Sequence, residues 1–159
     1  MYFWNINNLK KDIREHRLSE TQIFYYVLIY VALSALGMEL VKYFPAEEFN
    51  SWDLTESVLY VAIAIVGTIA AYRANGGAVG QGFAAKYFSI GLVVLIRFLP
   101  LAILVLIAIV AYHGLTVDWS SSEVEESFDT GWLEVTLVSV WYVAYYVRVV
   151  KHIRDTAKA

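Results

Sequence analysis

The chain has 159 residues, of which 59% are hydrophobic and 17% are charged, and its formal net charge is −3. An ordinary soluble domain is less apolar and more charged, so this composition predicts an integral membrane protein with little chain left for a water-soluble catalytic domain. The lack of cysteine excludes disulfides, thiolate nucleophiles and cysteine metal sites.

Residues 1–21 are predicted to be a basic amphipathic leader on the cytoplasmic side. Apolar side chains recur in it every three or four residues, at Phe3, Ile6, Leu9 and Ile13. Basic side chains fall mostly between them, at Lys10, Lys11, Arg14 and Arg17. This spacing is typical of a helix lying on a membrane surface, and a simple polar leader is the alternative.

Four later stretches are long and apolar enough to cross a hydrocarbon core of roughly 30 Å, which takes about 20 helical residues. They cover residues 22–44, 55–73, 87–112 and 131–150. None of them alternates apolar and polar residues as a transmembrane strand would. The sequence therefore predicts an all-α membrane protein, with a four-transmembrane-helix bundle over residues 22–150 and a basic tail over 151–159.

Two capping patterns mark expected helix starts. Asp53 is followed three residues later by Glu56, an acidic variant of the capping box, at the start of the second span. Ser120 and Glu123 have the same spacing and predict a short helix in the connection after the third span.

The positive charges predict the orientation of the bundle. Four crossings place three basic segments on one side: Lys10, Lys11, Arg14 and Arg17; Arg73 and Lys86; Arg148, Lys151, Arg154 and Lys158. The connections at 45–54 and 113–130 contain acidic residues and neither lysine nor arginine. Because short cytoplasmic segments carry the excess of lysine and arginine, we expect both termini in the cytoplasm and the chain in the plasma membrane, as a multi-pass protein of the bacterial inner membrane.

Arg97 interrupts the third span, three residues before Pro100. If the span enters near Tyr87, Arg97 lies roughly 15 Å deep, close to the bilayer midplane. A central arginine costs about 2.5 to 3.5 kcal/mol on insertion scales, so it is expected to face protein or water and to find a partner.

Two carboxylates in other spans are the candidate partners. Glu39 and Glu134 each lie roughly 5 to 8 Å inside the outer end of a span. Ala32 and Ala35 share a helical face with Glu39, which predicts that this face points inward, although Lys42 is also close enough to pair with Glu39. We therefore expect an intramembrane charge network of Arg97, Glu39 and Glu134, which either fastens the helices or serves a substrate, lipid or ion.

The glycine-rich segment "ANGGAVGQGFAA", residues 74–85, contains a G-x-G-x-x-A arrangement. Dinucleotide binding requires a strand before that turn, and here a transmembrane helix precedes it. A flexible connection is expected instead, and it is the candidate hinge or headgroup contact. The residues proposed for that contact are Arg73, Gly76, Gly77, Gly80, Gly82 and Lys86.

The aromatic run "WYVAYY", residues 141–146, lies in the fourth span. Trp141 and Tyr145 share a face with Glu134 and Arg148, which suggests a surface packed against other helices or a partner. Lipid-facing or core aromatics are an equal alternative.

Catalytic and metal-binding patterns are missing from the sequence. The sequence has no Ser-His-Asp arrangement, no paired intramembrane aspartates and no His-Glu-x-x-His helix. His16 and His152 are expected on one side and His113 on the other, so we expect no metal site, no cofactor and no enzyme activity.

Two classes of function remain. The first is a noncatalytic accessory, assembly or immunity-type module that binds a partner. The second is a small oligomeric transporter or channel component, with Arg97, Glu39 and Glu134 lining a path. The expected partners are the lipid bilayer and a membrane protein or further copies of this chain, without nucleic acid.

Overall fold

The computed structural model describes residues 1–40, 49–116 and 130–157. Five α-helices and one short 3-10 helix form in them, and these residues contain no strand. The elements are α1 (Ile6–Arg14), α2 (Glu20–Leu40), α3 (Ser51–Ala74), η2 (Gly77–Val79), α4 (Phe83–Thr116) and α5 (Trp132–Ala157). In this part of the chain, α2, α3, α4 and α5 are long and apolar enough to cross a membrane, as the sequence predicts.

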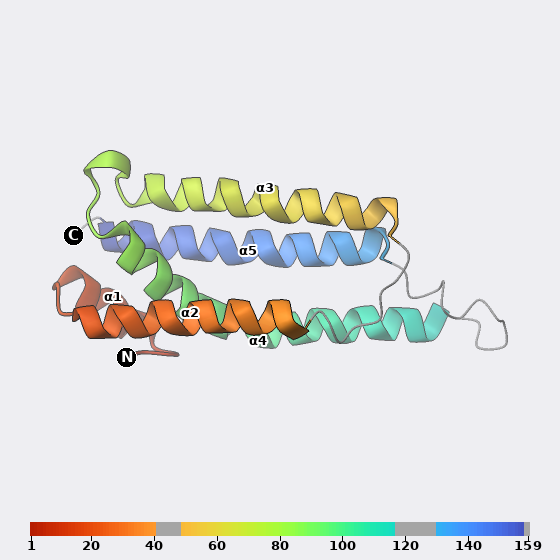
Figure 1. Ribbon diagram of the computed structural model, residues 1–159, viewed down its shortest axis with the longest axis horizontal. Coiled ribbons are helices and arrows are strands. Elements are labelled where there is room, and N and C mark those ends of the chain that lie inside the picture. The colour runs from red at the N-terminus through yellow and green to blue at the C-terminus, as the bar shows by residue number, and fades with distance from the viewer. Residues whose placement is uncertain (41–48, 117–129, 158–159) are drawn as a thin grey trace.

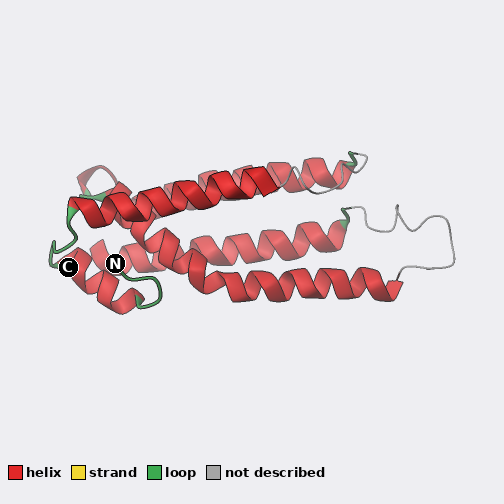
Figure 2. Cartoon of the chain, turned by 60° about the horizontal axis from the view of Figure 1, so that its bottom comes forward, coloured by secondary structure: helices red, strands yellow, loops and turns green. Residues whose placement is uncertain are grey.

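The long helices pack side by side in the order α3, α5, α4, α2 (Figures 1 and 2). Helix α5 contacts both α3 and α4, and α2 packs on α4, where the rings of Tyr30 and Phe88 meet edge to face with centroids 5.3 Å apart. Both termini, α1 and η2 lie at one end of the bundle, here called the terminal end. The other end, where α3 and α5 begin, is called the opposite end.

Helix α1 forms because the leader has both a cap and an apolar stripe. The Asn5 side chain accepts a hydrogen bond from the Asn8 amide at 3.1 Å, and Ile6, Leu9 and Ile13 are buried. The stripe packs on α4 and α5. The predicted amphipathic helix is therefore present, but its apolar side covers the bundle and not a membrane surface.

Tyr2 ties the chain before α1 to α2. The Tyr2 amide donates to the Tyr26 hydroxyl at 2.7 Å, and that hydroxyl donates to the Tyr2 carbonyl at 3.1 Å. The Tyr2 hydroxyl donates to the Asp12 carboxylate at 2.7 Å, which raises the pKa of Tyr2. Residues 1–21 are thus folded onto the bundle at several points.

Helix α3 starts three residues earlier than the capping pattern predicts. Asn50 is the N-cap, and its side chain and that of Asp53 each accept a hydrogen bond from the other's backbone. Asp53 therefore closes the box and does not open it, because an asparagine caps as well as an aspartate does. The second pattern, at Ser120 and Glu123, lies outside the described residues.

Helix α4 is longer than a bilayer requires. Its 34 residues measure about 51 Å, against a hydrocarbon core of roughly 30 Å. Pro100 lies inside it, and Figure 1 shows the first part of the helix running obliquely before the rest runs roughly parallel to α3 and α5. A proline removes a backbone hydrogen bond and bends a helix in this way.

Helix α5 supplies much of the core. Tyr145, Tyr146, Val149, Ile153 and Thr156 are buried along it. The helix continues to Ala157, so most of the predicted basic tail is the last part of this helix. Ile153 and Thr156 are buried there, in the region that α1 covers.

Candidate functional site

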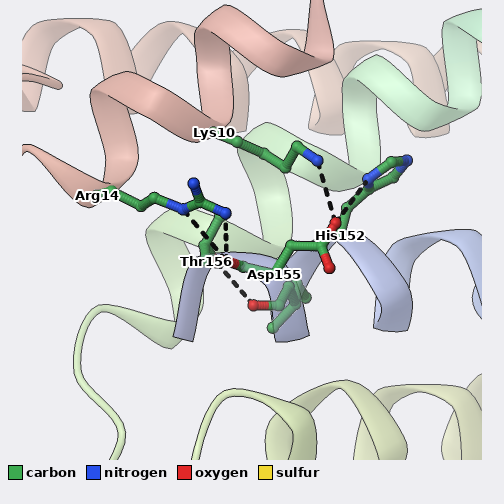
Figure 3. Close-up of polar contacts among 6 residues, drawn as sticks. Lys10, Arg14, His152, Asp155 and Thr156 are labelled. Carbon is green, nitrogen blue, oxygen red and sulfur yellow. Dashed lines mark hydrogen bonds and ion pairs between the residues drawn. The ribbon is translucent and has the colours of Figure 1, made fainter. Parts of the chain in front are cut away.

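The terminal end is held together by contacts between α1 and the last turn of α5. Lys10 Nζ lies 3.1 Å from the Asp155 carboxylate. Arg14 donates from Nε at 3.2 Å and from Nη2 at 2.7 Å to the Asp155 carbonyl, a C-terminal helix carbonyl that has no partner further along the helix. Figure 3 shows both side chains reaching from α1 to Asp155. Segments more than 140 residues apart thus form one unit.

Arg97 belongs to this end of the molecule. Its guanidinium carbon lies 5.8 Å from the centroid of the Trp4 ring, a cation–π contact with the chain before α1. Side chains on a helix lean toward its N-terminus, and α4 begins at the terminal end, so Arg97 extends toward that end and not toward the carboxylates.

Glu134 is part of a different group, at the opposite end. Its Oε1 lies 2.7 Å from His113 Nε2, and its Oε2 accepts a hydrogen bond from the Gly131 amide at 3.0 Å. Both side chains are largely buried. His113 ends the third span and Glu134 begins the fourth, so their shared connection was the signal in the sequence that could have paired them.

The structure does not assemble the expected charge network. Among the described side chains no ion pair joins Arg97 to Glu39 or Glu134. Glu39 lies near the end of α2, where Ala32 and Ala35 are exposed and do not form the inward face that their size predicted. Helix α2 packs instead through its first half, where Tyr26 is buried.

The aromatic run of α5 packs inside the bundle. The Tyr87 hydroxyl lies 3.0 Å from that of Thr68 and 3.3 Å from that of Tyr146, and Tyr145 donates to the Gly91 carbonyl at 3.4 Å. Tyr145 and Tyr146 are therefore core aromatics packed against neighbouring helices, and their hydroxyls find partners as buried polar groups must.

The glycine-rich connection forms a compact turn held by side-chain hydrogen bonds. Asn75 is buried at its centre; its Oδ1 accepts from Lys86 Nζ at 2.9 Å, and its Nδ2 donates to the Gln81 carbonyl at 3.3 Å. The glycines serve this geometry in two ways: Gly76, Gly77 and Gly82 have positive φ, and a side chain on Gly80 would collide with the Asn75 carbonyl.

A cavity of about 700 Å³ adjoins this turn. Four of the predicted contact residues line it, namely Gly76, Gly80, Gly82 and Lys86. Arg14 and His16 from the leader line the same cavity, which sequence spacing could not show because they are some 60 residues away. Arg73 lies elsewhere, in a hollow that it shares with Arg154 of α5.

The described residues contain no group of three histidine, aspartate or glutamate side chains placed to hold a metal ion. No family model matches the chain, and no match was found among curated proteins or solved structures.

Proposed function

We propose that the chain is a small noncatalytic multi-pass membrane protein, an accessory, assembly or immunity-type module that binds a protein partner at its terminal end. The observation that supports this is the attachment of α1 to the end of α5 through Lys10, Arg14 and Asp155. It makes a preformed surface from the two ends of the chain. A preformed surface loses less entropy on binding than a mobile leader and tail would.

The terminal end is basic on its outside, which favours a cytoplasmic position and an acidic partner. Exposed cations there include Lys11, Arg14, Arg17, Arg73, Arg148, Lys151 and Arg154. The segments predicted on the other side carry acids without lysine or arginine. By the excess of lysine and arginine in cytoplasmic segments, we place both termini in the cytoplasm of a cell with the bundle in the bacterial inner membrane.

Crosslinking in native membranes tests the partner. A photoreactive residue replaces Lys11 or Arg17, both exposed at the terminal end, and as a control replaces Leu104, exposed on α4. We expect a discrete protein adduct from positions 11 and 17 and not from 104, weakened when Arg14 is changed to Glu. The same adducts from position 104, or no adduct from the terminal end, would contradict a partner site there.

A transporter or channel component is the second candidate, because polar groups do lie inside the bundle. The hydroxyls of Thr68, Tyr87 and Tyr146 are linked near the terminal end, and His113 and Glu134 are paired at the opposite end. Fully buried apolar side chains, including Ile90, Leu92 and Val93, also lie on α4. These favour a closed core over a continuous polar path.

Flux from reconstituted liposomes separates the two candidates. We expect the wild-type protein to pass protons, common cations and anions no faster than empty liposomes do. Flux that is abolished by Glu134→Gln or Arg97→Leu in protein that stays helical, and partly kept by Arg97→Lys, would replace the binding module with a transporter.

A further inference from the structure

A long groove follows the seam between α3 and α5, on the side of α5 that α4 does not cover. It consists of two adjoining hollows of about 880 and 670 Å³, both lined by Val66, Ala70, Val150 and Arg154. Only residues of α3 and α5 line them. Because α3 and α5 are both apolar enough to cross a membrane, this groove would open toward lipid.

Small residues on α3 create the groove. Ala62, Gly67 and Ala70 line it, and the ring of Tyr146 packs so closely on Gly67 that a Cβ there would overlap it. The two helix backbones therefore approach closely, while the larger exposed Val66 and Val147 stand beside the seam. The result is an apolar groove on the surface of the bundle. Small residues form its base, and the side that faces away from the two helices is open.

Cations close the groove at the terminal end. Arg73 from the last turn of α3 and Lys151 and Arg154 from the end of α5 line it, and all three residues are exposed. Asp155 also lines this end, but its carboxylate lies 3.1 Å from Lys10 Nζ and is neutralised there. The three groove cations are therefore left with an excess of positive charge.

The length of the groove matches one leaflet. From Val143 to Arg154 it follows eleven helical steps of α5, or about 16 Å. Half of a hydrocarbon core of roughly 30 Å is about 15 Å. A lipid whose acyl chain lies along Val143, Val147 and Val150 would thus have its headgroup at the level of Arg73 and Arg154.

We propose that this groove binds one anionic phospholipid from the leaflet at the terminal end, with an acyl chain along the seam and the phosphate among Arg73, Lys151 and Arg154. Charge complementarity selects this occupant, since basic pockets between transmembrane helices attract anionic headgroups and arginine can bind phosphate through two donors at once. Arg73, Lys151 and Arg154 also belong to the basic terminal end described above, but the groove itself is lined by α3 and α5 alone and includes no residue of α1.

Lipid retention tests the headgroup site. The full chain is reconstituted in vesicles of equal phosphatidylglycerol and phosphatidylcholine, extracted in mild detergent, and its bound lipid measured by native mass spectrometry. We expect phosphatidylglycerol to be retained in excess, and Arg73→Gln and Arg154→Gln each to lower that excess about fivefold. The control is Arg148→Gln, which removes an exposed cation of α5 outside the groove and should leave the excess unchanged.

A second pair of variants tests the acyl chain. Ala70→Phe fills the groove where the two hollows meet, whereas Ala108→Phe adds the same ring to an exposed position of α4. Only Ala70→Phe should release the bound lipid, and glycerol phosphate at equal concentration should not displace it. Far-UV circular dichroism checks that each variant is folded, and Lys151→Gln replaces any arginine variant that is not.

Four results would overturn the proposal. Equal retention of the two lipids would exclude a headgroup site. Equal losses in Arg148→Gln and Arg154→Gln would show that the positive charge acts only diffusely. Retention by Ala70→Phe at the wild-type level, or displacement by glycerol phosphate, would exclude an acyl chain in the groove.

Discussion

At the scale of single residues, Arg97 shows how the direction of a side chain decides its partner. The sequence places the arginine within reach of carboxylates in other spans, and depth alone does not say which way it extends. The backbone of α4 does, because helical side chains lean toward the N-terminus. The guanidinium therefore meets Trp4, and Glu134 pairs with His113.

A double-mutant cycle checks this partnership. Arg97→Leu and Trp4→Leu should couple by about 0.5–1 kcal/mol in detergent unfolding, the usual size of a cation–π contact at an exposed site. Arg97→Leu and Glu134→Gln should add without coupling, since the two residues belong to different ends of the bundle. Coupling with Glu134 and none with Trp4 would restore the intramembrane network that the sequence predicts.

At the scale of elements, two contacts determine how the helices fit. One is the close approach of α3 and α5 at Gly67. Gly67→Ala should destabilise the protein by about 1–3 kcal/mol, because the added methyl overlaps the Tyr146 ring. Gly37→Ala in α2 is the matched control: no atom lies within 4 Å of the new methyl, and an exposed helical glycine changed to alanine should gain about 0.5–1 kcal/mol. Thermal unfolding in detergent would measure the stability of both variants. Equal changes in the unfolding temperature would contradict the close packing of α3 on α5 at Gly67.

The other contact is the docking of α1 on α4 and α5. Leu9 is fully buried there, so Leu9→Ala should cost about 2–5 kcal/mol of local stability and increase amide hydrogen exchange over residues 6–14. Lys11→Ala, exposed on the same helix, should leave exchange unchanged. Unchanged exchange in Leu9→Ala would mean that α1 is not held by its apolar stripe.

At the scale of the whole molecule, the testable property is the orientation in the membrane. Single cysteines at Asn8, Val79 and Ala157 should be protected from an impermeant thiol reagent in intact cells, and one at Ser121 should react. The chain has no cysteine of its own, so each signal has one source. Labelling at position 79 but not at 121 would reverse the proposed orientation.

The sequence by itself determined the elements of this protein. Helix-forming apolar runs long enough to cross a bilayer predict α2 to α5, and the three- and four-residue spacing of Ile6, Leu9 and Ile13 predicts α1. The apolar runs and the spacing in the leader are local properties of the sequence. They can be recognised without knowing how the helices pack on one another. Even so, boundaries shifted: Asn50, not Asp53, caps α3, and α5 runs on to Ala157.

Only the tertiary structure decided which residues meet. The leader joins the end of α5 through Lys10 and Asp155, and Arg14 comes to the cavity of the glycine turn, although long stretches of sequence separate them. The groove between α3 and α5 has the same origin, since it depends on Gly67 facing Tyr146. Such pairs depend on the rotation and order of the helices, which arise from packing many side chains together and leave no periodic trace in any one segment.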